Sequence, residues 1–187
     1  MDNWLQAVTQ LKQYLYVDEN DLLRDKCRNH AYSENLIQEG EKFLWEYNGA
    51  DRMKICGTLG HLYRIKGDTE TALPYLERYK EYSLKYENDE IATLALLRYA
   101  EGLKYAREYR EALAIFEEVL ERCQILNIEK YGNIGWQQLG KCYFEMGNLK
   151  QAENCFLKAL LLRRKINDPK LLEASEKVLS FMMKIKK

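Results

Sequence analysis

Apolar and small residues recur along this chain in one pattern, which is written three times at an interval of 40 residues. The clearest copy consists of Trp136, Leu139, Gly140, Tyr143, Gly147, Ala152, Phe156 and Ala159. In the middle copy the same places hold Leu96, Tyr99, Ala100, Leu103, Arg107, Ala112, Phe116 and Val119. In the first copy they hold Cys56, Leu59, Gly60, Tyr63, Gly67, Ala72, Leu76 and Tyr79. A repeat of this length predicts a stacked array in which each unit covers the apolar face of its neighbour.

Each copy predicts two helices joined by a tight turn. Gly147-Asn148 and Gly67-Asp68 provide a glycine to end the first helix and a capping side chain to begin the second. The middle copy has the weaker turn Arg107-Glu108. We therefore expect helix pairs at 51–66 with 69–87, 90–106 with 109–126, and 131–146 with 149–166, followed by a capping helix at 169–185.

The first fifty residues follow the pattern poorly, because Glu19 and Asn20 stand where a packed leucine and glycine should be. We expect a helix at 3–16, a polar break at 18–21, a short helix near 22–30 and a helix at 34–48 capped by Ser33. The chain then divides into N-terminal helices (1–50), three helix pairs (51–166) and a C-terminal capping helix (167–187). The first segment is either a degenerate first repeat or a separate cap.

Composition excludes several classes of function. Lys plus Arg and Asp plus Glu both number 29, so no net charge attracts the chain to nucleic acid or to an anionic membrane. No apolar run is long enough to span a bilayer, and no signal segment is present, which predicts a cytoplasmic protein. Five cysteines without a short CxxC spacing predict buried free thiols rather than disulfides or a zinc module.

The sequence contains no constellation typical of catalysis. Its histidines are His30 and His61, which lie far apart and have no partners at metal-ligand spacing. No ordered catalytic triad, dinucleotide loop or paired-carboxylate cleft can be identified. We therefore predict that the protein is not an enzyme, with no catalytic residues, no cofactor and no metal.

At these positions the chain resembles the tetratricopeptide repeat family. The run Trp136-x2-Leu139-Gly140-x2-Tyr143-x8-Ala152-x3-Phe156-x2-Ala159 carries the family signature. The resemblance implies an all-α fold, a right-handed superhelical array of antiparallel helix pairs with capping helices. The family repeats every 34 residues, so the longer spacing here implies lengthened helices, similar to a branch found in bacterial peptide-sensing regulators and in scaffold proteins. Relatives bind peptides or proteins in a concave groove lined by the first helix of each pair.

Carried onto this chain, the resemblance predicts a partner-binding groove on the first helices. Its candidate residues are Lys54, His61, Arg64, Leu97, Arg98, Glu101, Lys104, Tyr105, Gln137, Lys141 and Phe144. Arginine and lysine in this set could hold an acidic peptide or a C-terminal carboxylate through charge-assisted hydrogen bonds. The alternative is that these charges are ordinary solvated groups on exposed helix faces.

Three functions remain open on this basis. The first is a non-catalytic module that binds a protein or peptide in the concave groove. The second is an inhibitor, an immunity- or antitoxin-like regulator that binds one protein partner, and the third is a peptide-sensing regulatory domain. We expect a protein or peptide partner, without nucleic acid or membrane. The sequence leaves the oligomeric state open and favours a monomer.

Overall fold

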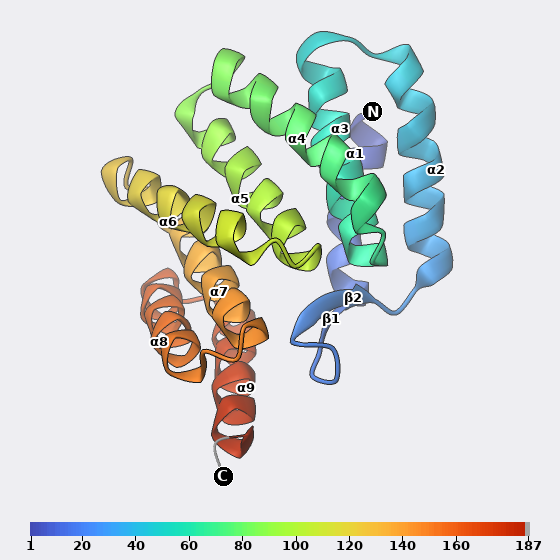
Figure 1. Ribbon diagram of the computed structural model, residues 1–187. Coiled ribbons are helices and arrows are strands. Elements are labelled where there is room, and N and C mark those ends of the chain that lie inside the picture. The colour runs from blue at the N-terminus through green and yellow to red at the C-terminus, as the bar shows by residue number, and fades with distance from the viewer. Residues whose placement is uncertain (186–187) are drawn as a thin grey trace.

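The computed structural model describes residues 1–185, whose helices pack as antiparallel pairs in a right-handed superhelical array (Figure 1). The all-α fold class predicted from the sequence is confirmed. The helices are α1 (Asp2–Gln10), α2 (His30–Glu46), α3 (Gly49–Lys66), α4 (Thr69–Tyr86), α5 (Asp89–Tyr105), α6 (Tyr109–Ile125), α7 (Glu129–Glu145), α8 (Leu149–Ile166) and α9 (Pro169–Ile185). From α3 onward these bounds agree with the predicted helices to within two residues. The last two residues of the predicted capping segment 167–187 lie outside the described residues.

The turn within each pair depends on one residue in the left-handed backbone region. Gly67 and Gly147 adopt φ of 91° and 79°, where glycine meets no steric penalty. Arg107 occupies the same place in the middle pair with φ 67°. In all three turns the next backbone N–H returns to a carbonyl five residues earlier, as from Asp68 to Tyr63. The middle turn therefore has the same geometry, at a cost in backbone strain.

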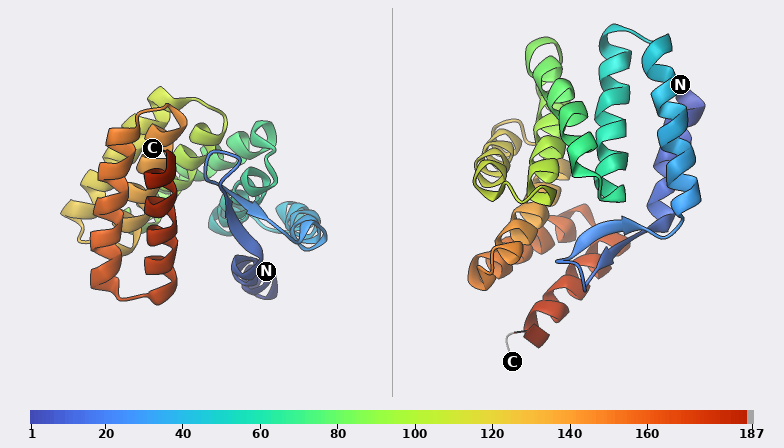
Figure 2. Two further views of the ribbon diagram at one scale, coloured as in Figure 1. Left: turned by 90° about the horizontal axis from the view of Figure 1, so that it is seen from below. Right: turned by 45° about the vertical axis from the view of Figure 1, so that its right-hand side comes forward.

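Small residues set the close approach of paired helices. A Cβ atom on Gly60 would lie 2.5 Å from Leu76, and one on Gly140 would lie 2.6 Å from Phe156. The first helices α3, α5 and α7 also contact one another in succession. We call the surface that they form the inner face, and the second helices α4, α6 and α8 lie on its other side (Figure 2).

The N-terminal segment differs from its prediction. The short helix expected near 22–30 is wrong, because strand β2 (Arg24–Cys27) pairs there with strand β1 (Leu15–Asp18) in an antiparallel hairpin. The helix expected at 3–16 ends at Gln10 and continues as a 3-10 turn over Leu11–Tyr14. The physical reason is local: residues 24–26 offer no apolar stripe for a helix to bury, whereas 15–17 are strand formers.

Helix α2 also begins earlier than expected. It starts at His30, and the side chain of Asn29, not Ser33, caps it by accepting from the N–H of Tyr32. Buried Trp4 of α1 donates from Nε1 to the carbonyl of Leu36 at 2.9 Å. This contact ties α1 to α2, and the two helices cover the array beside α3.

The hairpin, defined as residues 15–27, projects from the α1–α2 connection toward the other end of the array (Figures 1 and 2). At its tip Leu22 and Leu23 both have positive φ, 53° and 60°. This conformation buries Leu23 in one hydrophobic cluster with Phe156 of α8 and with Val178 and Met182 of α9. The hairpin thereby connects the first helices of the chain with its last.

Among residues 1–185 no helix combines the length and apolar character that crossing a membrane requires.

Candidate binding site on the inner face

The last turns of α3, α5 and α7 bring several charged side chains together on the inner face. Arg64, Lys104 and Lys141 each come from a different first helix, and their side chains are nearly inaccessible to solvent. The carboxylate of Glu101 pairs with Arg64 at 2.9 Å. Glu145, whose side chain is also inaccessible, lies 3.9 Å from Lys104. The prediction of ordinary solvated charges is therefore wrong for these three cations.

A carboxylate from outside the repeats lies among these cations. Asp25 of the hairpin accepts a hydrogen bond from Nζ of Lys141 at 2.9 Å, and its other oxygen lies 3.9 Å from Arg64. Burial acts to raise the pKa of Asp25, but Lys141 and Arg64 outweigh it and hold that pKa well below its ordinary value. Asp25 is therefore ionised, and its charge is shared between α3 and α7.

Tyr105 at the end of α5 binds the backbone of the same residue. Its hydroxyl accepts from the N–H of Asp25 at 2.6 Å and donates to the carbonyl of Asp25 at 3.2 Å. The guanidinium groups of Arg64 and Arg24 lie 4.6 and 5.0 Å from the centre of its ring. Such cation–π contacts are strongest where water is excluded. Three first helices thus hold one extended residue by side chain and main chain together.

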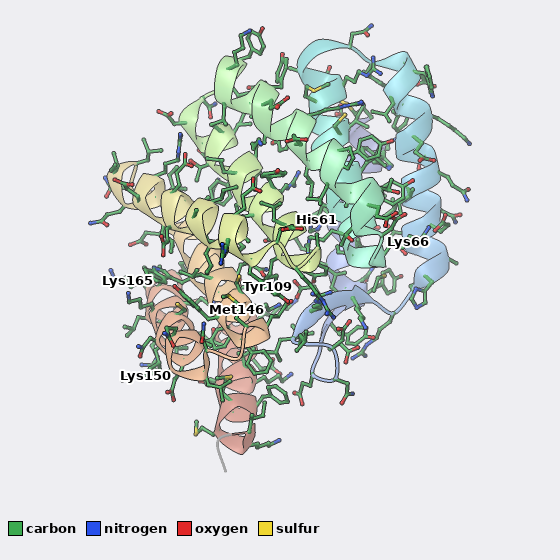
Figure 3. The ribbon with its side chains drawn as sticks, viewed as in Figure 1. His61, Lys66, Tyr109, Met146, Lys150 and Lys165 are labelled. Carbon is green, nitrogen blue, oxygen red and sulfur yellow. The ribbon has the colours of Figure 1, made fainter. Side chains whose placement is uncertain are left out.

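Arg24 extends the network toward α7. Its Nη2 donates to Glu145 at 2.7 Å. The hydroxyl of Tyr109, which is labelled in Figure 3, donates to the same carboxylate oxygen at 3.2 Å. Lys104 donates to Oε1 of Gln138 at 2.9 Å. Burial and the neighbouring Lys141 lower the pKa of Lys104 to about 8. We call Arg64, Lys104, Tyr105, Lys141 and Glu145 the anchor cluster.

The structure distributes the predicted groove residues unevenly. Arg64, Glu101, Lys104, Tyr105 and Lys141 come together around the hairpin. The remaining candidates make no hydrogen bond or ion pair with the hairpin within the described residues. They are half-buried His61 beside Arg64, half-buried Arg98, buried Leu97 and Gln137, Phe144 against Phe181 of α9, and exposed Lys54.

His61 is not a free groove side chain. Its Nδ1 lies 3.1 Å from Nη2 of Arg64. Burial, together with the nearby charges of Arg64 and Arg98, lowers its pKa well below the ordinary value. His61 is therefore neutral at neutral pH, and it orients a guanidinium rather than presenting a charge.

Two buried polar atoms of the inner face have no hydrogen-bond partner within the described chain. They are Nη1 of Arg64 and Oε1 of Gln137. The guanidinium of Arg98 likewise makes no hydrogen bond or ion pair within residues 1–185, although it lies 5.8 Å from the ring of Tyr79. Buried polar groups of this kind are normally satisfied, so the inner face retains hydrogen-bonding capacity beyond what the hairpin uses.

Sequence reasoning missed the hairpin residues Arg24 and Asp25 and their partner Glu145. A signal was present, because the strand-forming Leu15-Tyr16-Val17 precedes the turn-forming Asn20-Asp21. That pattern predicts a hairpin. It does not predict that the hairpin lies against residues more than a hundred positions later.

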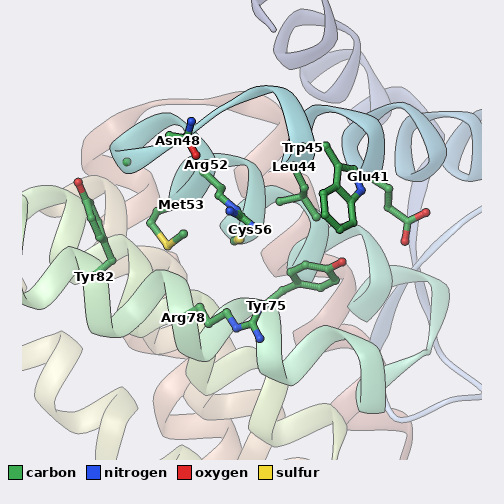
Figure 4. A pocket seen from close by; sticks show the side chains of 11 residues that line it. Glu41, Leu44, Trp45, Asn48, Arg52, Met53, Cys56, Tyr75, Arg78 and Tyr82 are labelled. Carbon is green, nitrogen blue, oxygen red and sulfur yellow. The ribbon is translucent and has the colours of Figure 1, made fainter.

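A cavity of about 690 Å³ lies between α2, α3 and α4 (Figure 4). It is lined by Glu41, Leu44, Trp45, Asn48, Gly49, Arg52, Met53, Cys56, Tyr75, Arg78 and Tyr82. The indole of Trp45 is 88% exposed. None of the predicted groove residues contributes to this cavity, so it is separate from the inner face.

Residues 1–185 contain no group of three His, Cys, Asp or Glu side chains arranged to hold a metal ion. All five cysteines are buried free thiols, as predicted. Burial raises the pKa of Cys142 to about 12 and that of Cys155 to about 11. These two thiols are therefore protonated and unreactive at neutral pH.

Comparison with known proteins identifies the repeats. The tetratricopeptide repeat family pattern matches residues 54–86 and residues 134–166. These ranges fall within the helix pairs α3 with α4 and α7 with α8. No curated protein sequence matches the chain.

Solved structures share the fold at low sequence identity. The apo form of RapI superposes with a TM-score of 0.68 at 18% identity, covering 98% of this chain and 62% of RapI. PlcR of Bacillus thuringiensis, solved in complex with the peptide PapR7 and DNA, gives a TM-score of 0.70 at 18% identity, covering 95% of this chain and 59% of PlcR. BtubC (BKLC) from P. vanneervenii gives 0.60 at 12% identity over 81% of this chain and 63% of BtubC.

The chain thus spans about three fifths of the length of RapI and of PlcR. Two matched repeats, the turns that separate their helices and the structural neighbours agree with one another. The chain contains tetratricopeptide repeats, matched over residues 54–86 and 134–166.

Proposed function

We propose that this protein is a non-catalytic module that binds a protein or peptide partner through its inner face. The observation that carries this proposal is the seating of Asp25, whose carboxylate and backbone are held by α3, α5 and α7 together. An arrangement that binds one extended acidic residue from outside the repeats has the chemistry to bind another.

The energetics favour a ligand with a carboxylate. Arg64 and Lys141 are inaccessible cations, and a buried cation without a counter-charge is strongly unfavourable. A carboxylate satisfies them through charge-assisted hydrogen bonds, which are about twice as strong as neutral ones. Oε1 of Gln137, which has no hydrogen-bond partner within the described residues, and the guanidinium of Arg98, which lies over the ring of Tyr79, offer further contacts on the same face.

A direct test uses Arg98, because its removal leaves no carboxylate unpaired within residues 1–185. Tagged wild-type protein and an Arg98→Ala variant are used to purify partners from a lysate of the source organism, and binding is then measured by calorimetry. We expect binding to weaken at least tenfold in Arg98→Ala, and to be unchanged in the matched control Arg110→Ala on the exposed side of α6. A partner that binds both variants equally would place the site elsewhere.

A peptide-sensing regulatory domain is the second candidate. The similarity to PlcR, which was solved with the peptide PapR7, favours it. In that case the ligand of the inner face is a short free peptide. Purification would then yield no stoichiometric protein, whereas a peptide-enriched extract of the same cells would raise the melting temperature of the wild-type chain.

A further inference from the structure

We propose that the hairpin is an internal ligand of the inner face, and that the partner supplies an extended segment of the same chemistry that replaces it. This inference rests on the proposed function of the inner face. It names the ligand as a protein segment with an aliphatic, a basic and an acidic residue in succession, the order of Leu23, Arg24 and Asp25.

The first step is the way in which Asp25 is held. Its N–H and its carbonyl both bond the hydroxyl of Tyr105, and its carboxylate bonds Lys141. Recognition of main chain and side chain at one residue is how binding sites read extended peptides. The contacts depend on the chemistry of one aspartate in an extended segment, and a segment from another protein offers the same groups.

The two residues before Asp25 complete the signature. Arg24 pairs with Glu145 at 2.7 Å, where the carboxylate is inaccessible and the arginine side chain is 14% exposed. Leu23 is 1% exposed and belongs to the cluster of Phe156, Val178 and Met182. A partner segment that carried only the acidic residue would leave Glu145 without its cation and the apolar cluster open.

Clefts flank the hairpin between its anchored residues 23–25 and its base, where Cys27 lies in the hydrophobic core. An open cleft of about 380 Å³ lies between it and α9 beside the Leu23 contact, lined on the hairpin side by Leu15, Tyr16, Val17, Glu19 and Leu23. A second cleft of about 250 Å³ lies between it and the residues of α2, α3 and α5 near Arg64. Clefts on two sides are what a replaceable segment requires.

The backbone of the tip also opposes permanent docking. Leu22 and Leu23 both occupy the left-handed region, which is unfavourable for a residue with a Cβ atom. Strain of this kind persists only while the surroundings enforce it, and it is typical of switch regions. A two-stranded hairpin has little stability of its own, so release lets the tip relax without exposing a large core.

The test supplies the hairpin as a separate molecule. A fluorescently labelled synthetic peptide of residues 14–28, with Cys27→Ser, is titrated into wild-type protein and into an Arg24→Ala/Asp25→Ala variant. This variant, which we call the released variant, lacks both charged anchors of its own hairpin. The matched control is Lys26→Ala, which removes the hairpin's exposed ion pairs with Asp18 and Asp21 and leaves both anchors intact.

We expect the released variant to bind the peptide at least tenfold more tightly than wild-type or Lys26→Ala protein does. In wild-type protein the hairpin occupies the site, so only a fraction of the molecules can bind the peptide. The apparent affinity for the peptide is lowered by that fraction. Changing Asp25→Asn in the peptide should weaken its binding at least tenfold, because the carboxylate contacts are lost. In the intact chain a short tether holds the hairpin near the inner face at an effective concentration on the order of mM. A folded released variant that binds no peptide at about that concentration overturns the inference.

Circular dichroism shows whether the released variant folds. If it does not fold, a second measurement on wild-type protein replaces the titration. Hydrogen exchange at the Asp25 amide is then followed in wild-type protein with and without excess peptide. Faster exchange at Asp25 with added peptide supports replacement of the hairpin. Unchanged exchange at saturating peptide shows that the hairpin stays in place, and overturns the inference.

The two proposals fail differently. A partner whose binding depends on Arg98 but does not compete with the hairpin peptide leaves the proposed function standing and overturns the internal ligand. A peptide that binds the released variant, in a protein whose partners ignore Arg98 and do not compete with the peptide, overturns the proposed function and replacement of the hairpin by a partner. It leaves only the hairpin as a detachable ligand of the inner face.

Discussion

Replacing Asp25 with asparagine removes one charge and keeps the shape of the side chain. The perturbation separates the electrostatic role of the carboxylate from the two main-chain bonds to Tyr105, which remain. Lys141 loses its anionic partner at 2.9 Å and Arg64 loses its more distant one at 3.9 Å. Arg64 keeps Glu101 as a counter-ion, so the effect is concentrated on Lys141.

The magnitude follows from two limits. A hydrogen bond to a charged group contributes about 1.5–3 kcal/mol, and breaking a buried ion pair costs about 3–5 kcal/mol. The Asp25 side chain is 23% exposed, and the asparagine carbonyl can still accept from Lys141. We therefore expect Asp25→Asn to lower the free energy of unfolding by about 2 kcal/mol. In a chain of this size that loss lowers Tm by about 4–8 °C.

The assay is urea unfolding at pH 7 together with calorimetry, with Lys26→Ala as the control. Lys26 pairs with Asp18 and Asp21 at the surface, and removing such pairs changes stability by less than about 1 kcal/mol. An Asp25→Asn variant as stable as the control would refute the electrostatic reasoning. If the hairpin can detach, Lys141 becomes exposed to water, which limits the cost of losing the carboxylate. A loss in the free energy of unfolding above about 5 kcal/mol would therefore refute detachment.

The pH dependence gives an independent check with a defined sign. The pKa of Asp25 in the folded state lies below its ordinary value of 3.8, held there against burial by Lys141, Arg64 and Lys104. The carboxylate therefore contributes its full stability above the ordinary value, and the contribution is lost as pH falls toward the folded pKa. The difference between wild type and Asp25→Asn should be constant from pH 7 to about 5 and shrink below about pH 4. A difference that grows in acid would contradict this assignment.

Three further predictions concern other parts of the chain. Arg107→Gly should raise the free energy of unfolding by about 0.5–1 kcal/mol in urea titration, because glycine relieves the left-handed strain at φ 67°; a loss would show that the arginine side chain matters there. Gly140→Ala should cost about 1–3 kcal/mol in the same assay, since the new Cβ would lie 2.6 Å from Phe156, and an unchanged stability would mean that α7 and α8 separate freely. Lys104 should titrate near pH 8 in ¹³C NMR of the dimethylated protein, because burial and Lys141 lower its pKa to about 8. The unfolded chain keeps that proton up to the ordinary value of 10.5, so this group's contribution to stability should rise with pH between the two values; titration above pH 10 would contradict the burial.

The repeats were predictable because their determinants are local. Gly67 and Gly147 end helices through backbone conformations that belong to single residues, and the apolar stripes recur within each helix. Even the middle turn, where Arg107 replaces glycine, follows the pattern of its neighbours. A pattern repeated three times reinforces each of its copies, so the bounds of α3 to α9 required no knowledge of distant contacts.

The candidate site was predictable only in part. The sequence placed Arg64, Lys104 and Lys141 on the first helices, and the spacing alone brought them to one side of the array. It could not show that they are buried, since burial depends on what lies against them. The covering element is the hairpin, which sequence reasoning treated as a polar break and a short helix.

The sequence by itself determined that this protein is an array of helix pairs, because periodicity and turn residues act over distances of a few residues. Only the tertiary structure decided that Asp25 meets Lys141, 116 positions away, and that Arg24 meets Glu145. The physical reason is that an ion pair between distant segments leaves no periodic trace in either segment. It exists only once the superhelix has brought the ends of α3, α5 and α7 beneath the hairpin.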